Sequence, residues 1–316
     1  MRILQCNNKF SNNLVVGFTT VNDDRDASGN PFPTVEIRDG AGTIYFGAEA
    51  SSTANLLKQR VLTITDNFEI NVGKHNILIG THNELTYAKN VFISSNFGRY
   101  QFASYDSFMN NLAPSRYRLG YSLIGGSGDE SLGAAEFNMN QYGLYVQDNI
   151  RVTDNFRVSL GVRADMPVWE DGNVNTDFNT RTVGLLEAAG KDLKGARVGQ
   201  AIENTVHFSP RVGFNYDVNG DKETQVRGGV GVFTSRVPLV WPGGAYNNYG
   251  MGQYFYDSQI VTTGPKPLFN PNTDVSSQMY SNGVAVGPVP GTGAVGGNID
   301  LFAKDFKLPQ VLKTSL

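Results

Sequence analysis

The chain has 316 residues, including 36 glycines, and its formal net charge at neutral pH is -3. This acidic balance leaves no basic field for a phosphate backbone, so nucleic acid is not an expected partner. The single cysteine, Cys6, excludes an internal disulfide and a cysteine-based zinc site. No apolar run approaches the ~20 residues of a membrane-spanning helix, so the chain could cross a bilayer only as a closed sheet.

Both ends of the sequence suggest an internal piece of a longer protein. Residues 1–10 contain no apolar core of an export signal. Residues 314–316 fall inside what reads as a new strand, without the terminal aromatic strand that outer-membrane barrels usually carry. We therefore expect residues 1–316 to form part of a barrel domain, with the signal peptide outside them.

Short turns alternate with long, polar, glycine-rich connections along the chain. Three short turns are predicted at 71–74, 152–155 and 219–223, and a fourth is expected before the first strand. Antiparallel strands joined in sequence alternate in direction, so all short turns fall on one side of the sheet and all long connections on the other. This asymmetry is typical of bacterial barrels, which have short periplasmic turns and long extracellular loops. The long connections run roughly over 22–54, 94–133, 170–205 and 237–310.

About seven complete strands and a truncated eighth are predicted between these connections. The segments 14–21 and 55–70 show the weaker patterns, and the segment from His75 onward is interrupted by Leu78. The later segments alternate with period two, as expected of strands with one apolar face. They span 141–151, 156–165, 206–218 and 224–233, and Phe233 is an exception in the last of them.

The two faces of these strands decide the environment. Arginine turned to lipid near the midplane would cost about 2 to 4 kcal/mol per residue, so the apolar faces should point outward and the polar faces inward. A ladder of charges on the inner face could select solutes, but ion pairs that tie neighbouring strands together are the favoured explanation. The residues expected to face the lumen are Arg157, Arg163, Asp165, Arg211 and Arg227.

A soluble β-sandwich would show the same alternation. Two features favour the membrane: the predicted strands run about ten to seventeen residues, longer than the usual globular strand, and their polar faces carry Arg and Gly rather than Lys and Glu. The predicted fold is therefore all-β, an antiparallel up-and-down transmembrane β-barrel, present in part, with long extracellular loops.

A series of strings follows in order along the chain: 66–68 (DNF), 73–75 (GKH), 141–148 (QYGLYVQD), 154–156 (DNF), 208–214 (FSPRVGF), 227–233 (RGGVGVF) and 308–310 (LPQ). From about residue 55 onward, this series resembles the barrel of TonB-dependent receptors. The resemblance is strongest to the Oar-like group, which carries a carboxypeptidase-regulatory-like N-terminal domain.

The resemblance implies a barrel of about 22 strands filled by a plug domain, of which about seven to eight strands fit here. The regulatory domain, the plug and the C-terminal strands are expected to lie outside residues 1–316. The partners implied are outer-membrane lipid, an extracellular nutrient, and a TonB complex that acts through the plug.

The last long connection, 237–310, is rich in aromatic residues, Gly and Pro and has no evident secondary structure. Segments of that length are often functional or disordered. Aromatic rings there could stack on a sugar, a peptide or a siderophore at the outer mouth. Alternatively, they could pack the loop against itself or reach the aromatic girdle at the membrane interface. The candidate substrate-binding residues are Trp241, Tyr246, Tyr249, Tyr254 and Tyr256.

No catalytic or cofactor motif is found, and neither an enzyme nor a metal site is expected. An oxygen-rich stretch around Asp24, Asp26 and Ser28 faintly resembles a calcium loop, but Val35 stands where the bidentate Glu should be. His75 and His82 lie seven positions apart, on opposite faces of one strand, and cannot share a metal there.

The sequence is compatible with three functions. The preferred one is an outer-membrane, TonB-dependent receptor that binds a bulky nutrient at its extracellular loops for energised uptake into the periplasm. The first alternative is an Oar-like surface component for protein secretion or adhesion. The second alternative is a secreted, soluble β-sandwich that binds carbohydrate through its aromatic loop.

Overall fold

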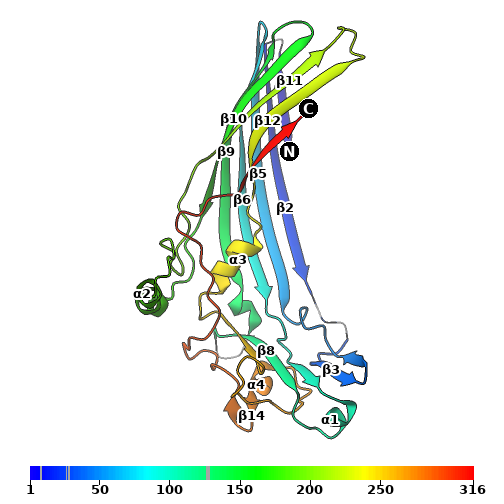
Figure 1. Ribbon diagram of the computed structural model, residues 1–316, viewed down its shortest axis with the longest axis vertical. Helices are drawn as coiled ribbons and strands as arrows, with labels where there is room; N and C mark the ends of the chain where they lie inside the picture. The colour runs from blue at the N-terminus through cyan, green and yellow to red at the C-terminus, as the bar shows by residue number, and fades with distance from the viewer. Residues whose placement is uncertain (8, 26, 28, 126–128) are drawn as a thin grey trace.

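The computed structural model describes residues 1–7, 9–25, 27, 29–125 and 129–316. Its main element is a tall, curved antiparallel sheet, which we call the wall (Figure 1). The described part of the wall has nine strands, whose order in space is their order in sequence. They are β1 (Arg2–Cys6), β2 (Phe10–Asp24), β5 (Asn55–Val72), β6 (His75–Phe92), β9 (Ala135–Arg151), β10 (Phe156–Trp169), β11 (His207–Asp217), β12 (Gln225–Thr234) and β16 (Gln310–Ser315).

The predicted meander is confirmed, but the wall contains one more strand than the sequence indicated. The additional strand, β1, pairs with β2 over five positions, from Arg2 opposite Val15 to Cys6 opposite Ser11. It is too short to show an alternation of its own. The wall is an open sheet in which β1 and β16 are the two edges, so the described residues form no closed barrel.

The short turns lie where they were predicted, all at the end of the wall that we call the turn end (Figure 1). β5 and β6 are separated only by Gly73 and Lys74, and Gly73 has a φ of 58°, a left-handed conformation that glycine adopts without strain. The connection between β9 and β10 covers 152–155, and that between β11 and β12 covers 218–224.

The long connections gather at the opposite, loop end, where three of them build a second sheet (Figure 1). The expectation that 237–310 lacks secondary structure is wrong. Its strand β13 joins strands from connections far away in sequence, and such short strands, paired over long separations, leave no local periodicity. The order is β13 (Gln253–Asp257), β8 (Arg116–Ser122), β7 (Arg99–Phe102), β3 (Thr34–Asp39) and β4 (Gly42–Phe46), with β3 parallel to β7.

The helical elements and one small hairpin also belong to the long connections. We call the five-stranded sheet, together with α1, α4 and the hairpin, the loop module. Among the described residues, no helix is long and apolar enough to cross a membrane. The remaining elements are α1 (Tyr105–Met109), a 3-10 helix (Glu130–Gly133), a π-helix (Phe178–Thr182), α2 (Val183–Ala188), α3 (Val240–Asn247), α4 (Val275–Gln278), β14 (Tyr280–Ser281) and β15 (Val284–Ala285).

The loop module has its own aromatic core. Tyr100 and Tyr117 are fully buried, and their rings are 4.8 Å apart. Both hydroxyls donate to Oε1 of Gln278, at 2.7 and 3.0 Å, which ties the third long connection of the module to the second. Burial raises the pKa of Tyr100 to about 12, so its hydroxyl stays protonated and can keep donating. The three long connections that build the loop module therefore pack into one folded unit rather than forming separate loops.

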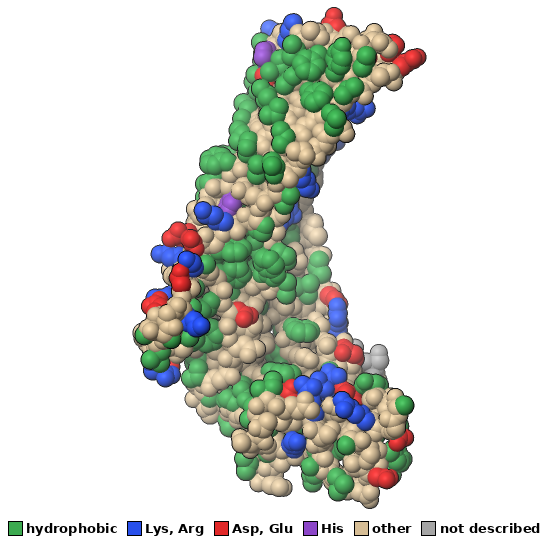
Figure 2. Space-filling view, viewed as in Figure 1, with side chains coloured by type: hydrophobic (Ala, Val, Ile, Leu, Met, Phe, Trp, Pro, Cys, Tyr) green, Lys and Arg blue, Asp and Glu red, His purple; other side chains and the backbone are tan. Residues whose placement is uncertain are grey.

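The apolar face of the wall is uncovered. Leu144, Leu160, Phe208 and Val212 are between 43% and 67% exposed, and the described residues place no second sheet over them. Figure 2 shows hydrophobic side chains gathered over the upper wall, whereas charged side chains concentrate toward the loop end and at the tips of the turns. A soluble sandwich would bury these residues between two sheets, so this alternative is wrong.

The opposite, polar face is concave. Nη2 of Arg236, just after β12, lies 2.7 Å from Oε1 of Glu84 on β6. In the sheet, β9, β10 and β11 lie between β6 and β12. A flat sheet would keep these residues far apart, because neighbouring strands are separated by about 4.8 Å each. The wall therefore curls around its polar side, and we call that side the concave face.

Candidate functional site

The register of the wall brings the five predicted inward-facing residues to one face. Arg157 lies opposite Asn215, Arg163 opposite Ser209 and Asp165 opposite His207, while Arg211 lies opposite Gly231. Arg227 joins them through its pairing with Asn215. Their common face is the concave one, because residues directly opposite in a sheet project to the same side.

Among these five residues, only Arg163 and Asp165 form an ion pair, so they do not make a continuous ladder of charges. Arg163 Nη2 lies 2.7 Å from Asp165 Oδ1, and the Asp165 side chain is only 4% exposed. The Arg163 guanidinium also lies over the ring of Tyr145, 5.3 Å from its centre. Arg211 contacts an aromatic ring as well, with its guanidinium 5.4 Å from the centre of Phe233. These contacts favour the structural interpretation of Arg163 and Arg211.

Glycines on the concave face make room for the long side chains beside them. A β-carbon at Gly80 would overlap the ring of Tyr145, and one at Gly143 would overlap the guanidinium of Arg163. The Tyr145 ring thus crosses β6, and its hydroxyl donates to Asn67 Oδ1 of β5 at 2.7 Å. At these positions the large side chain and the glycine occur together because the side chain lies in the space that a β-carbon would take.

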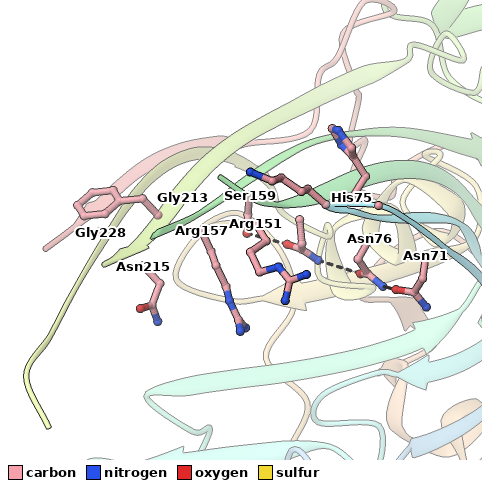
Figure 3. Close-up of a pocket in the computed structure, with 13 residues that line it drawn as sticks. Asn71, His75, Asn76, Arg151, Arg157, Ser159, Gly213, Asn215 and Gly228 are labelled. Atoms are coloured by element: carbon pink, nitrogen blue, oxygen red, sulfur yellow. Dashed lines mark hydrogen bonds between the residues drawn. The ribbon is translucent and has the colours of Figure 1, made fainter. Parts of the chain in front are cut away.

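A cavity of about 720 Å³ opens on the concave face at the turn end. Its lining comes from all strands between β5 and β12 and from the turn between β5 and β6. A row of polar side chains crosses its floor: Ser159 donates to Asn149 at 2.7 Å, Asn149 to Asn76 at 3.4 Å, and Asn76 to Asn71 at 2.8 Å. Figure 3 shows Asn71, Asn76 and Arg157 on the same side of the sheet, while His75 points to the other side.

Positively charged side chains lie next to this polar row, at the strand ends closest to the short turns. Arg151 of β9 lies directly opposite Arg157 of β10, which in turn lies opposite Asn215 and, one strand further, Arg227. Lys74 stands beside them, and its ammonium donates to the carbonyl of Val152 at 2.9 Å. None of the described residues that line the cavity is an Asp or a Glu. The turn end of the concave face is therefore a positively charged, hydrogen-bonding surface.

At the loop end the last connection folds inward and covers the concave face. α3 lies against β9 (Figure 1). There, Tyr246 stacks on Phe137 with the ring centres 4.5 Å apart. Further along, Trp169 and Leu308 belong to a buried apolar cluster, and the backbone N–H of Leu308 donates to Nε2 of His207 at 2.9 Å. The concave face thus has an open, polar turn end and a covered, apolar loop end.

A second cavity, of about 590 Å³, lies between the end of β6, α3 and β13, and we call it the mouth cavity. Its exposed rings are Phe92 and Phe255, which are 47% and 44% exposed. Neither Lys nor Arg lines the described cavity. The polar side chains that line it include Asn90, Asn248, Gln253, Asn298 and Asp300.

The predicted aromatic candidates fall into two environments. Tyr254 lines the mouth cavity and also contacts Tyr121, whereas Trp241 is 51% exposed on α3. Tyr246, Tyr249 and Tyr256 are buried, the last completely, with its hydroxyl bonded to the carbonyl of Pro265. Ligand binding by these rings stays a prediction, and the burial of three of them favours the alternative that they pack the loop against itself.

The histidines are separated as expected from their spacing. His75 lies on the apolar face, with its Nδ1 2.6 Å from Oδ2 of Asp148. His82 lies on the concave face, near Glu84 and Arg236. No group of three metal-ligating side chains occurs in the part of the chain that the structure describes. Asp26 and Ser28 of the calcium-like stretch lie outside the described residues.

Sequence reasoning missed the two cavities, although it assigned some of their residues to the correct face. Alternation placed Arg151 and Asn149 on the polar side of the β9 segment, but the direct pairing of Arg151 with Arg157 depends on the register through the turn 152–155. The mouth cavity assembles residues from β6 and from three separate parts of the last connection, and no local signal relates them.

A family model described as "Outer membrane beta barrel domain" matches residues 3–316, which is nearly the whole chain. No curated protein and no solved structure matches.

Proposed function

The chain belongs to the outer membrane beta barrel domain family, and we propose that it is part of a TonB-dependent receptor of the Oar-like kind. In this proposal the chain forms part of the barrel wall and the extracellular loops at its outer opening. The family places the protein in the bacterial outer membrane. In the proposed function, the receptor binds a bulky nutrient at its extracellular loops and admits it to the periplasm through an energised plug. The solute undergoes no chemical change.

The observation that carries this proposal is the open wall. In a bilayer, each unpaired backbone group at the edges β1 and β16 would cost several kcal/mol, so both edges need strand partners. A barrel in which nine strands form only part of the wall encloses a wide interior, because barrel diameter grows with strand number. A wide interior requires a plug if the membrane is to stay sealed, and the motifs that resemble TonB-dependent receptors agree with that requirement.

The loop end supports the binding part of the proposal. The mouth cavity presents amide and carboxylate groups beside the exposed rings of Phe92 and Phe255, and no cation lines it. Rings with neighbouring amides suit a polar, uncharged solute, which can stack on the ring and form hydrogen bonds around its edge. Within the loop module, β13 pairs with β8, which positions Gln253 and Phe255.

The test is uptake by cells that carry or lack the intact gene. The strain without the gene should grow poorly on some single nutrient sources from a panel of oligosaccharides, peptides and ferric siderophores, and should grow normally on small sugars and amino acids. Collapse of the proton-motive force should stop uptake by the parent strain while solute still binds to the cells.

A loop variant connects the uptake to the mouth cavity. Phe255→Ala should raise the half-saturating solute concentration about tenfold, because a stacking platform is lost. Leu185→Ala, which removes another exposed side chain from α2, outside the cavity, is the matched control and should change nothing. An unchanged nutrient range combined with loss of secreted proteins would instead support the secretion or adhesion alternative.

A further inference from the structure

The cations at the turn end are arranged in a way that the transport proposal does not explain. Arg151 and Arg157 are direct cross-strand partners, and like charges in that position destabilise a sheet. Their β-carbons are therefore only about 5 Å apart. Both side chains are exposed, and among the described residues neither guanidinium has an ion-pair partner.

The nearby carboxylates are directed elsewhere. Asp217 is on the same face, but its two oxygens accept from the backbone N–H groups of Gly220 and Lys222, both at 3.0 Å. Glu69, on β5, lies 3.4 Å from the hydroxyl of Ser11. Asp148 lies on the apolar face with His75. Among the described residues, therefore, none of these carboxylates forms an ion pair with Arg151 or Arg157.

The neutral side chains of the cavity are arranged as further donors. In the row from Ser159 to Asn71, each of Asn149 and Asn76 uses one N–H of its amide nitrogen for the next residue. An amide nitrogen carries two N–H groups, so each has a second one for a ligand in the cavity. The hydrogen bonds within the row also fix the side chains, which lowers the entropic cost of binding.

We propose that the turn-end cavity binds a phosphate group, held between Arg151 and Arg157 and completed by donors from Asn149 and Asn76. Guanidinium groups match the geometry of phosphate oxygens and bind them in a bidentate manner. A phosphate carries enough acceptor oxygens to bond two arginines and an amide together, whereas one carboxylate has only two oxygens. The volume of about 720 Å³ is large enough for a phosphorylated sugar as well as for inorganic phosphate.

Binding can be measured on the purified intact protein in detergent, without any energy source, so the result is independent of the transport proposal. Isothermal titration at constant ionic strength should show saturable binding of inorganic phosphate and none of chloride. Arg151→Gln and Arg157→Gln should each weaken binding about tenfold or more, and the double variant should abolish it. A parallel titration with glucose 6-phosphate distinguishes a site for phosphorylated solutes from a site for the free ion.

The matched control is Arg60→Gln, which removes the same charge from the other face of the wall, where Arg60 lies over the ring of Tyr87. It should leave phosphate binding unchanged. Arg157→Lys keeps the charge but loses the bidentate geometry, and it should still lose most of the affinity. If the Gln variants fail to fold, Arg157→Lys and Asn149→Ala supply the same comparison. Equal binding by all variants, or no saturable binding by the parent protein, would overturn the proposal.

Discussion

At the scale of single residues, the concave face is built from large side chains that lie across glycines. Tyr145 passes over Gly80 to reach Asn67, and Arg163 lies over Gly143 while it pairs with Asp165. The first contact connects β9 to β5, which are not direct neighbours in the sheet, and the second packs β10 against its neighbour β9. Glycine is therefore needed at these positions for packing, because another side chain occupies the space that a β-carbon would take.

The first prediction concerns Gly80→Ala. The new methyl group would overlap the Tyr145 ring, so the substitution should lower the free energy of unfolding by about 1 to 3 kcal/mol, as overpacking does. Urea unfolding of the intact protein in lipid vesicles measures the change. Gly184→Ala, on α2 with no other heavy atom within 4 Å of the added carbon, should not lower the free energy of unfolding, because alanine is favoured over glycine in a helix.

A second variant identifies the cause. If the ring is responsible, Gly80→Ala should cost little in a protein that already carries Tyr145→Ala, because the methyl group then has free space. An undiminished penalty in that background would show that the backbone of β6, and not Tyr145, requires glycine.

At the scale of elements, the loop module depends on one buried ion pair between β8 and β13. Arg116 Nε donates to Asp257 Oδ1 at 3.0 Å, and the Asp257 side chain is 2% exposed. Burial by itself would raise the pKa of Asp257, but the hydrogen bonds from Arg116 and from the backbone of Gln259 hold it below its usual value. The charged carboxylate is therefore the form that stabilises the module.

The second prediction follows from the sign of that shift. A carboxyl group whose pKa is lower in the folded state contributes its stabilisation above the unfolded pKa of about 3.9, and loses it as the pH falls through the folded value. Acidification from pH 5 to below about 3.5 should therefore loosen β8 and β13. Hydrogen exchange of these two strands as a function of pH measures the loss.

Two variants test whether Asp257 is the responsible group. Asp257→Asn should already exchange faster at pH 7, and its exchange should depend less on acidification, because the titrating carboxylate is gone. Asp192→Asn changes an exposed pair with Lys194 and should keep the acid response of the parent protein. Identical acid profiles for Asp257→Asn and the parent would contradict the prediction.

At the scale of the whole molecule, the wall separates two media. Its convex face exposes apolar side chains that no other part of the described structure covers, and its concave face holds the Arg163–Asp165 pair, the exposed Arg151 and Arg157, and both cavities. β5 and β6 have 18 residues each, more than the ~9 to 11 that cross a bilayer. The surplus length carries the loop module away from the membrane surface.

The third prediction tests this orientation with two adjacent residues of β9. Val146 is 43% exposed on the convex face, and Gln147 lies on the concave face. Val146→Arg should lower the free energy of unfolding in lipid by about 2 to 4 kcal/mol, because the charge enters the hydrocarbon. Gln147→Arg, placed in water, should change it little. A larger penalty for Gln147→Arg would mean that the faces are reversed.

The sequence by itself determined the wall: the positions of its turns, the alternation of its strands and the side on which Arg157, Arg163 and Asp165 lie. These features are local, since a period of two and a turn of a few residues can be read within one segment. Only the tertiary structure decided the loop module, the inward fold of α3 and the pairing of Arg151 with Arg157. They depend on contacts such as that of Tyr100 with Gln278, 178 positions apart, and on a register that shifts by one residue with the geometry of a turn.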